Sequence, residues 1–205
     1  MLTIISNLAL LIPCVRAAYW HRVFRAFIFF WMVWASALYH LCDSFGACLF
    51  NFATHHFLDF FFAQLLIILG ALYLVHWRTD LLWLEWVVTL LGALTIVVLQ
   101  ITLDGELIVQ AGIVGFCFVG LVLYWVIYAC TIGKGRLPPY DWAALLAGVA
   151  LTSGSIVLFS VQNVWPQAYW AAHSLWHVAA AMGQYYLLAI KEPAPRYANA
   201  AAKIN

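Results

Sequence analysis

Long apolar stretches separated by short polar breaks run through the whole chain. Each stretch has, or nearly has, the roughly 20 apolar residues that an α-helix needs to cross the hydrocarbon core of a bilayer. The pattern therefore predicts an all-α protein, a bundle of seven transmembrane helices. The expected spans are about 2–19, 24–42, 57–77, 81–100, 107–129, 141–160 and 169–190.

The composition agrees with this pattern, since 67% of the residues are hydrophobic and only 8% are charged. Seven spans use nearly all of the chain, so we expect one membrane domain, residues 1–190, followed by a polar tail, 191–205. A net charge of +1 without clustered basic residues gives no reason to expect a nucleic-acid partner. The sequence leaves the plasma membrane, the ER and the Golgi open as locations, and a homo-oligomer open as the assembly.

The basic residues predict how the bundle is oriented. All of them fall on alternate connections, and by the positive-inside rule these connections face the cytosol. We therefore expect an outside or lumenal N-terminus, a cytosolic C-terminus, and a first span that is not cleaved, because no basic leader precedes it. The residues concerned are Arg16, Arg22, Arg25, Arg78, Lys134, Arg136, Lys191, Arg196 and Lys203.

Few ionisable side chains fall within the expected spans, and such residues usually face a bundle interior or a cavity. The predicted orientation places His40, Asp59, His173 and His177 at one depth, near the outer face. Glu85 falls about one turn from the inner face, and we interpret it as an interfacial or locally paired carboxylate.

His173 and His177 are four residues apart, so on a helix both rings project from one face. An isolated pair at this spacing is more often a hydrogen-bonded core pair than a metal site. His40, at the same depth, supplies a third imidazole, and three protein ligands plus a water are how catalytic zinc is held. We therefore predict a Zn²⁺ site at His40, His173 and His177, although imidazole also suits iron and copper.

A hydrolytic metal site also needs a general base, and Ser174 occupies the position of the glutamate in HExxH metalloproteases. Asp59 is the best candidate base; the alternative is an aspartate satisfied by a helix N-terminus. Ser36 and Asp43 lie four residues before and three after His40, where they could orient that ring. Ser36 could equally bond its own helix, and Asp43 remains a rival base.

Two of the five cysteines, Cys42 and Cys48, flank the first outer loop. They are predicted to form a disulfide if that loop faces an oxidising compartment. His55 and His56, before the third expected span, are interpreted as interfacial residues of the same loop.

These motifs resemble those of a known superfamily. The arrangement is similar to the CREST superfamily of seven-span metallohydrolase-like proteins, which includes alkaline ceramidases and the progestin and adiponectin receptors, and most similar to its transmembrane-protein-8 and myomaker branch. The resemblance covers all seven spans in order, with specific motifs in spans two, three and seven. The residues that carry it are Ser36, Tyr39-His40-Leu41-Cys42-Asp43, Cys48, Asp59-Phe60 and His173-Ser174-Leu175-Trp176-His177.

The resemblance implies a zinc held by His40, His173 and His177, with Ser36 and an aspartate beside it. It also implies attack on an amide or ester bond of a membrane lipid, since members of this branch include a GPI-lipid phospholipase. Another member is a myoblast fusion factor, so the alternative is a non-catalytic membrane-remodelling or cell-fusion protein of the myomaker type with a structural zinc. The aspartates at the depth of the histidines favour the hydrolase.

Overall fold

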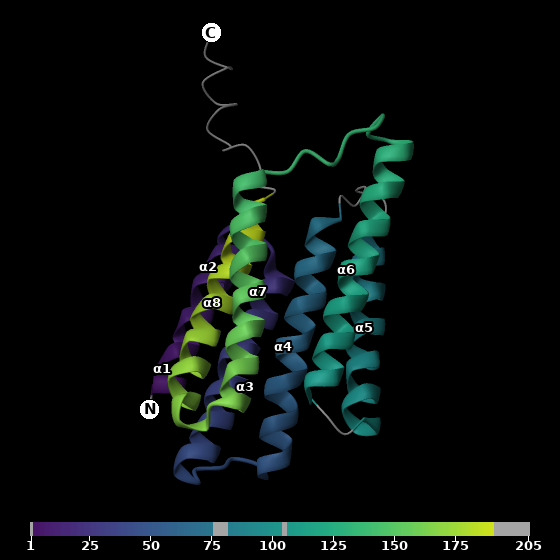
Figure 1. The fold of residues 1–205 in the computed structure, drawn as a ribbon. Coiled ribbons are helices and arrows are strands. Elements are labelled where there is room, and N and C mark those ends of the chain that lie inside the picture. Colours follow the sequence, from purple (N-terminus) through teal and green to yellow (C-terminus); the bar gives the residue numbers. More distant parts are fainter. Residues whose placement is uncertain (1, 76–81, 104–105, 191–205) are drawn as a thin grey trace.

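The structure is a computed structural model that describes residues 2–75, 82–103 and 106–190 (Figure 1). All regular secondary structure in these residues is helical, which confirms the all-α prediction. The expected break at Arg78–Asp80 and the tail 191–205 lie outside the described residues.

The described helices form seven rods. The first rod joins two α-helices through a short 3₁₀ segment, and a second 3₁₀ turn precedes the last rod. The elements are α1 (Leu2–Ser6), η1 (Asn7–Leu10), α2 (Leu11–Tyr19), α3 (Val23–Phe45), α4 (Phe52–Leu74), α5 (Leu82–Thr102), α6 (Glu106–Thr131), α7 (Trp142–Val164), η3 (Pro166–Ala168) and α8 (Tyr169–Ala189).

Six of the rods, from the first to α7, are long and apolar enough to cross a membrane. The 21 residues of α8 are also enough for a crossing. Its two histidines and Gln184 lower its mean hydropathy, so α8 is not among the six helices that are apolar enough by composition. The protein is thus an integral, multi-pass membrane protein.

The α3–α4 connection is shorter than expected. α3 continues to Phe45 and ends at Gly46, whose φ of 66° is a left-handed conformation that glycine adopts without strain. α4 begins at Phe52 because the side chain of Asn51 caps it, accepting a hydrogen bond from the Thr54 N–H at 2.8 Å. The interpretation of His55 and His56 as loop residues is therefore wrong, since both lie in the first turn and a half of α4.

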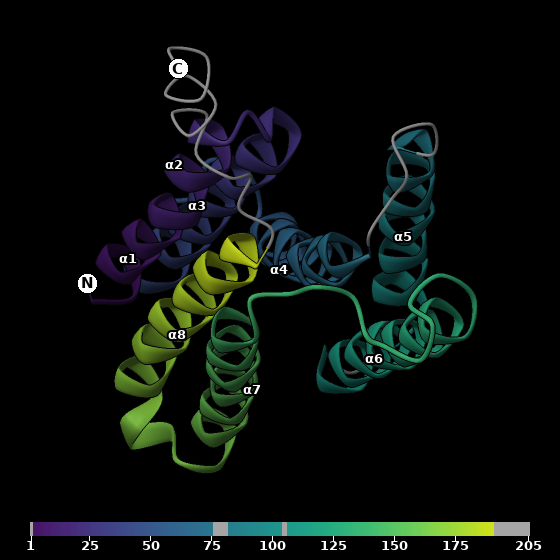
Figure 2. The same ribbon diagram turned by 90° about the horizontal axis from the view of Figure 1, so that it is seen from above.

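α8 occupies the centre of one group of helices. It packs against α7, α1, α2 and α4, whereas α5 and α6 lie to the side, against α4 (Figures 1 and 2). Most apolar side chains of α5 and α6 are exposed, as expected of helices that face lipid.

Glycines allow the close packing of α7 and α8. A Cβ added to Gly148 would lie 2.8 Å from Leu187 Cδ2, and one added to Gly183 would lie 2.5 Å from Thr152 Oγ1. Small residues let membrane helices approach closely, so this contact fixes α8, and the side chains it carries, relative to α7.

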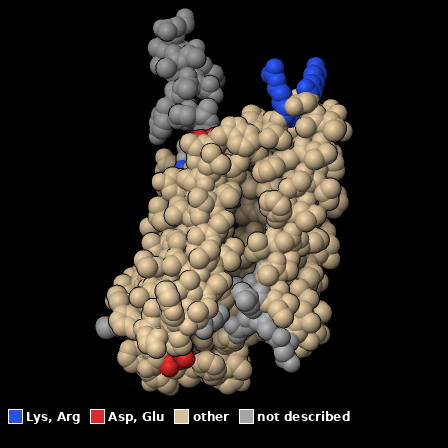
Figure 3. Space-filling view, viewed as in Figure 1, with Lys and Arg blue, Asp and Glu red and all other residues tan. Residues whose placement is uncertain are grey.

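An ion pair ties α3 to α5 at the end of the bundle opposite the α3–α4 connection. The buried Arg25 guanidinium donates to Glu85 Oε1 and, at 2.6 Å, to the Leu69 carbonyl. The expectation that Glu85 is locally paired is confirmed. The exposed Lys and Arg side chains of the α6–α7 connection stand at the same end (Figure 3).

Candidate metal centre

Two helices carry the three histidines. His40 lies near the end of α3, and His173 and His177 lie one turn apart near the start of α8, all at the end where α3 meets α4. The three residues are 0%, 4% and 1% exposed, respectively. α1 and α4 each pack against both α3 and α8, so four helices surround the rings.

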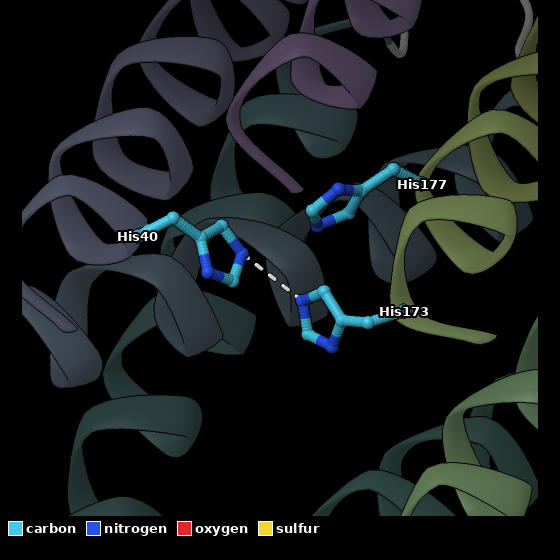
Figure 4. Close-up of side chains that lie close together, drawn as sticks. All are labelled: His40, His173 and His177. Carbon is cyan, nitrogen blue, oxygen red and sulfur yellow. Dashed lines mark hydrogen bonds between the residues drawn. The ribbon is translucent and has the colours of Figure 1, made fainter. Parts of the chain in front are cut away.

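The structure brings the three imidazoles together. His40 Nε2 and His173 Nε2 lie 3.0 Å apart, and one nitrogen from each of the three rings falls within 4.8 Å of the others. Figure 4 shows the rings pointing toward one another from the two helices. Among the described residues, no other group of histidine, cysteine, aspartate or glutamate side chains meets this geometry.

The residues present fit a zinc ion. Zinc binds imidazole nitrogen at roughly 2.0–2.1 Å in a tetrahedral arrangement, which separates ligand nitrogens by about 3.3 Å. The 3.0 Å between His40 and His173 is close to this value. Three neutral imidazoles are a ligand set that suits zinc and leaves a fourth position for water or substrate.

Ser36 lies beside the same point but contacts a different ring from the one expected. Its Oγ, fully buried on α3, is 3.5 Å from His177 Nε2 on α8. The hydroxyl therefore lies beside the point where the histidine nitrogens converge. Its hydrogen-bond partner is His177, so Ser36 does not orient the His40 ring. The role of this serine beside the histidine cluster stays a prediction.

The two candidate aspartates occupy different environments. Asp59 lies on α4 and is 2% exposed, whereas Asp43 lies in the last turn of α3 and is exposed. Neither carboxylate belongs to the group of nitrogens within 4.8 Å. The histidine nitrogens thus form the group without a carboxylate, and of the two aspartates only Asp59 is buried.

Sequence reasoning missed Ser6. Its Oγ lies 2.8 Å from His177 Nδ1, the ring nitrogen opposite Ser36. Ser6 stands near the outer end of the first span, at the depth of the histidines, but nothing in the sequence distinguishes it from an ordinary serine of an apolar helix. Aromatic rings complete the surroundings, with Trp176 4.8 Å and Tyr169 5.1 Å from the His173 ring, centroid to centroid.

The α3–α4 connection is fixed close to His40. Cys42 and Cys48 form the predicted disulfide, with Cα atoms 4.4 Å apart. The buried His55 accepts the backbone N–H groups of Leu49 and Phe50 at Nε2, at 3.2 and 3.0 Å. This histidine has a structural role, since it holds the connection at the end of the bundle that contains the site.

A cavity of about 70 Å³ adjoins His177 between α4 and α7. It can hold a few water molecules. Its walls are mostly apolar, and its polar groups come from His177, Thr152, Ser155 and Gln184. α7 packs closely along α8, whereas it meets α4 through side chains such as Phe159, whose ring lies 5.9 Å from that of Phe60, centroid to centroid. Figure 3 shows the molecule hollowed in the middle of this face. The remaining walls are formed by Leu10, Met32, Ala63, Leu66, Ile67, Ile156, Phe159, Trp176 and Ala180.

Residues 1–178 match the family described as "Protein of unknown function (DUF3522)". The chain belongs to the DUF3522 family. This segment contains both elements of the histidine cluster, because it extends past His177. The three buried imidazoles are thus a site within the region that the DUF3522 family shares with this chain.

Two curated proteins are similar along almost the whole chain. "Post-GPI attachment to proteins factor 6" of Mus musculus is 27% identical over 200 residues, which are 94% of this chain and 25% of that protein. The Homo sapiens protein of the same name is 26% identical over 197 residues, which are 92% of this chain and 24% of that protein. The chain thus spans about a quarter of the length of the curated relatives that it matches.

These findings correct the assignment made from motifs. The family is DUF3522, and the similar curated proteins are post-GPI attachment factors, so the assignment to the CREST superfamily is wrong, while the transmembrane-protein-8 and myomaker branch is partly consistent with these relatives. The motifs behind that assignment lie in three spans only. Similarity over nearly the whole chain is the stronger criterion.

Proposed function

We propose that this DUF3522 protein is a zinc-dependent intramembrane hydrolase that cleaves an ester or amide bond of a membrane lipid. The observation that carries the proposal is the convergence of three buried imidazoles, from α3 and α8, beside a cavity between α4 and α7. Three ligands leave a coordination position open, whereas a structural zinc is normally closed by four protein ligands. This difference favours hydrolysis over a non-catalytic protein with a structural zinc.

His40, His173 and His177 would hold the ion. When bound, zinc supplies a water of lowered pKa and polarises the carbonyl of the scissile bond. Asp59 is the proposed general base, because it is the buried carboxylate at this end of α4. Ser36, next to His177 Nε2, is placed to hydrogen-bond a reacting oxygen.

The surroundings suit a lipid substrate. The cavity walls are mainly apolar, and we propose that the side between α4 and α7 opens to the bilayer. A lipid could bring its ester or amide to the histidines from this side while its chains remain in apolar surroundings. The enclosed histidine cluster would keep bulk water away from the bond, apart from the few molecules that the cavity holds.

The relatives narrow the substrate class. Their name refers to a step after GPI has been attached to proteins. We therefore propose the lipid part of a GPI anchor as the first substrate to test, and an ester in it as the scissile bond. The outer position of the site, proposed from the charge pattern, agrees with this choice, because GPI-anchored proteins occupy the lumenal and outer leaflets.

The test couples metal content to product formation. Purified protein would be analysed for zinc and incubated with a mixed lipid extract and with a GPI-anchored protein, and released fatty acid would be measured. We expect one zinc per chain and fatty-acid release that His173→Ala abolishes. His21→Asn is the matched control, because His21 is exposed at the other end of the bundle and asparagine tolerates its φ of 55°. Zinc without product from any lipid would favour the non-catalytic alternative.

A further inference from the structure

The first helix contacts the histidine cluster through the Ser6 hydroxyl and the backbone carbonyl of Thr3, both of which face His177. Ser6 Oγ lies 2.8 Å from His177 Nδ1 and 2.9 Å from the carbonyl oxygen of Thr3. Ser6 and His177 are 171 positions apart in the chain, so this contact is a product of the fold. α1 packs along α8, which brings the serine to the ring.

The two partners of Ser6 determine the direction of both hydrogen bonds. A carbonyl oxygen can only accept, so the one hydroxyl proton of Ser6 goes to Thr3. The Ser6 oxygen must then accept its second bond from the Nδ1–H of His177. A neutral imidazole carries one N–H, which leaves a lone pair on Nε2.

We propose that Ser6 is a positioning residue, which holds His177 in the Nδ1–H tautomer and turns its Nε2 lone pair toward the metal position. This inference rests on the proposed zinc site, because the direction of the Nε2 lone pair matters only if a metal binds there. The tautomer itself can be measured in metal-free protein. Nε2 is the nitrogen on the side of Ser36, 3.5 Å from that hydroxyl. Ser6 and Ser36 thus flank the ring, one at each nitrogen.

The local structure of the first rod supports this role. The chain passes from α-helix to 3₁₀-helix directly after Ser6, at Asn7–Leu10. The fully buried Asn7 donates its side-chain N–H to the same Thr3 carbonyl at 2.9 Å. Thr3 is therefore held by two side-chain donors, which fixes the acceptor that orients the Ser6 hydroxyl.

Ser174 differs from Ser6 in its hydrogen bonds, and the difference shows what is unusual about Ser6. Ser174 lies between the two histidines of α8, and its Oγ donates to Trp170 O of its own helix at 2.6 Å. Such a bond within one helix is the ordinary behaviour of a membrane serine. Ser6 makes an equivalent bond to Thr3 and a second one to another helix.

The first measurement uses metal-free protein labelled with ¹⁵N-histidine in detergent micelles. We expect His177, identified by loss of its signals in His177→Gln, to carry its proton on Nδ1. Ser6→Ala should raise the share of the Nε2–H tautomer, although the Thr3 carbonyl still favours Nδ1–H. Ser6→Thr should retain the Nδ1–H form because its hydroxyl can make the same bonds, and Ser174→Ala should match wild type. A wild-type His177 protonated on Nε2 would overturn the proposal without any variant.

The second measurement is the zinc dissociation constant, from competition with a chelator. Loss of a group that orients a metal-bound histidine weakens binding by about 10–100-fold. We expect this change in Ser6→Ala and not in Ser174→Ala. If wild type binds no zinc but its tautomer depends on Ser6, the zinc site fails and the tautomer assignment stands. If zinc binds equally to wild type and Ser6→Ala and the tautomer is unchanged, Ser6 has no positioning role.

Discussion

His40 Nε2 and His173 Nε2 lie 3.0 Å apart, although 133 positions separate them in the chain. The backbones of α3 and α8 do not approach closely in the described residues, whereas α1 and α4 pack closely against both. The side chains alone therefore cross the space between the two helices. A metal ion at this point would link α3 to α8, so its binding should contribute to the stability of the bundle as well as to chemistry.

The first prediction concerns that link. Removing zinc from wild-type protein with a chelator should lower the thermal unfolding temperature, because a ligand present at 100 times its dissociation constant stabilises the folded state by about 2.7 kcal/mol. His173→Ala should unfold at a lower temperature and no longer respond to the chelator. His21→Asn should respond as wild type does. An equal response in His173→Ala would place the zinc elsewhere.

The histidine cluster could be predicted from sequence because two simple quantities define it. Four-residue spacing puts His173 and His177 on one face of a helix, and the alternation of basic connections puts His40 at the same depth. Neither argument depends on how the helices are rotated. The arguments place the rings at one depth, and the positions of α3 and α8 in the fold then bring them together.

The partners of the cluster could not be predicted in the same way. Ser36 shares a helical face with His40, yet its hydroxyl contacts His177, because the rotation of α3 relative to α8 decides which ring it meets. Ser6 looks like an ordinary residue of an apolar span until α1 is placed along α8. The pairing of Arg25 with Glu85 likewise needs the positions of α3 and α5.

The second prediction tests how α8 is held in place. Gly183→Ala would put a methyl group 2.5 Å from Thr152 Oγ1 and 3.1 Å from the Thr152 backbone nitrogen. Because α7 and α8 must then move apart, we expect a loss of about 1–3 kcal/mol and weaker zinc binding, since α8 carries two of the ligands. Thermal unfolding and chelator competition measure the two effects.

Gly154 provides the control for this substitution, because a Cβ added there meets nothing within 4 Å. Gly154→Ala should leave zinc affinity unchanged and raise stability by up to about 1 kcal/mol, as expected when alanine replaces glycine in a helix. Equal effects of the two substitutions would mean that the α7–α8 contact does not position the site.

The third prediction is the orientation of the bundle. The alternation of basic connections predicts an N-terminus outside or in the lumen and a C-terminus in the cytosol. The Cys42–Cys48 disulfide supports the same orientation, because disulfides persist in oxidising compartments and this one lies at the end opposite the basic connections. A C-terminal tag should be detected in permeabilised cells only. Detection on intact cells would reverse the topology and move the site to the inner leaflet.

The last prediction separates metal binding from chemistry. Asp59 is buried on α4 and does not belong to the cluster of ligand nitrogens. If it is the general base, Asp59→Asn should keep its zinc yet lose turnover by about 10²-fold or more. His173→Ala should lose both zinc and turnover. Zinc content and fatty-acid release, measured on the same preparations, distinguish the two classes of variant.

Asp43→Asn completes this experiment, because Asp43 is the rival base one turn from His40. Its carboxylate is exposed in the last turn of α3, where water can solvate it, so we expect its neutralisation to change turnover far less than that of Asp59. Full activity in Asp59→Asn together with loss in Asp43→Asn would move the role of base to Asp43. If both variants were fully active, neither carboxylate would accept the proton, and the reaction would need a base outside the pair of aspartates near this end of the bundle.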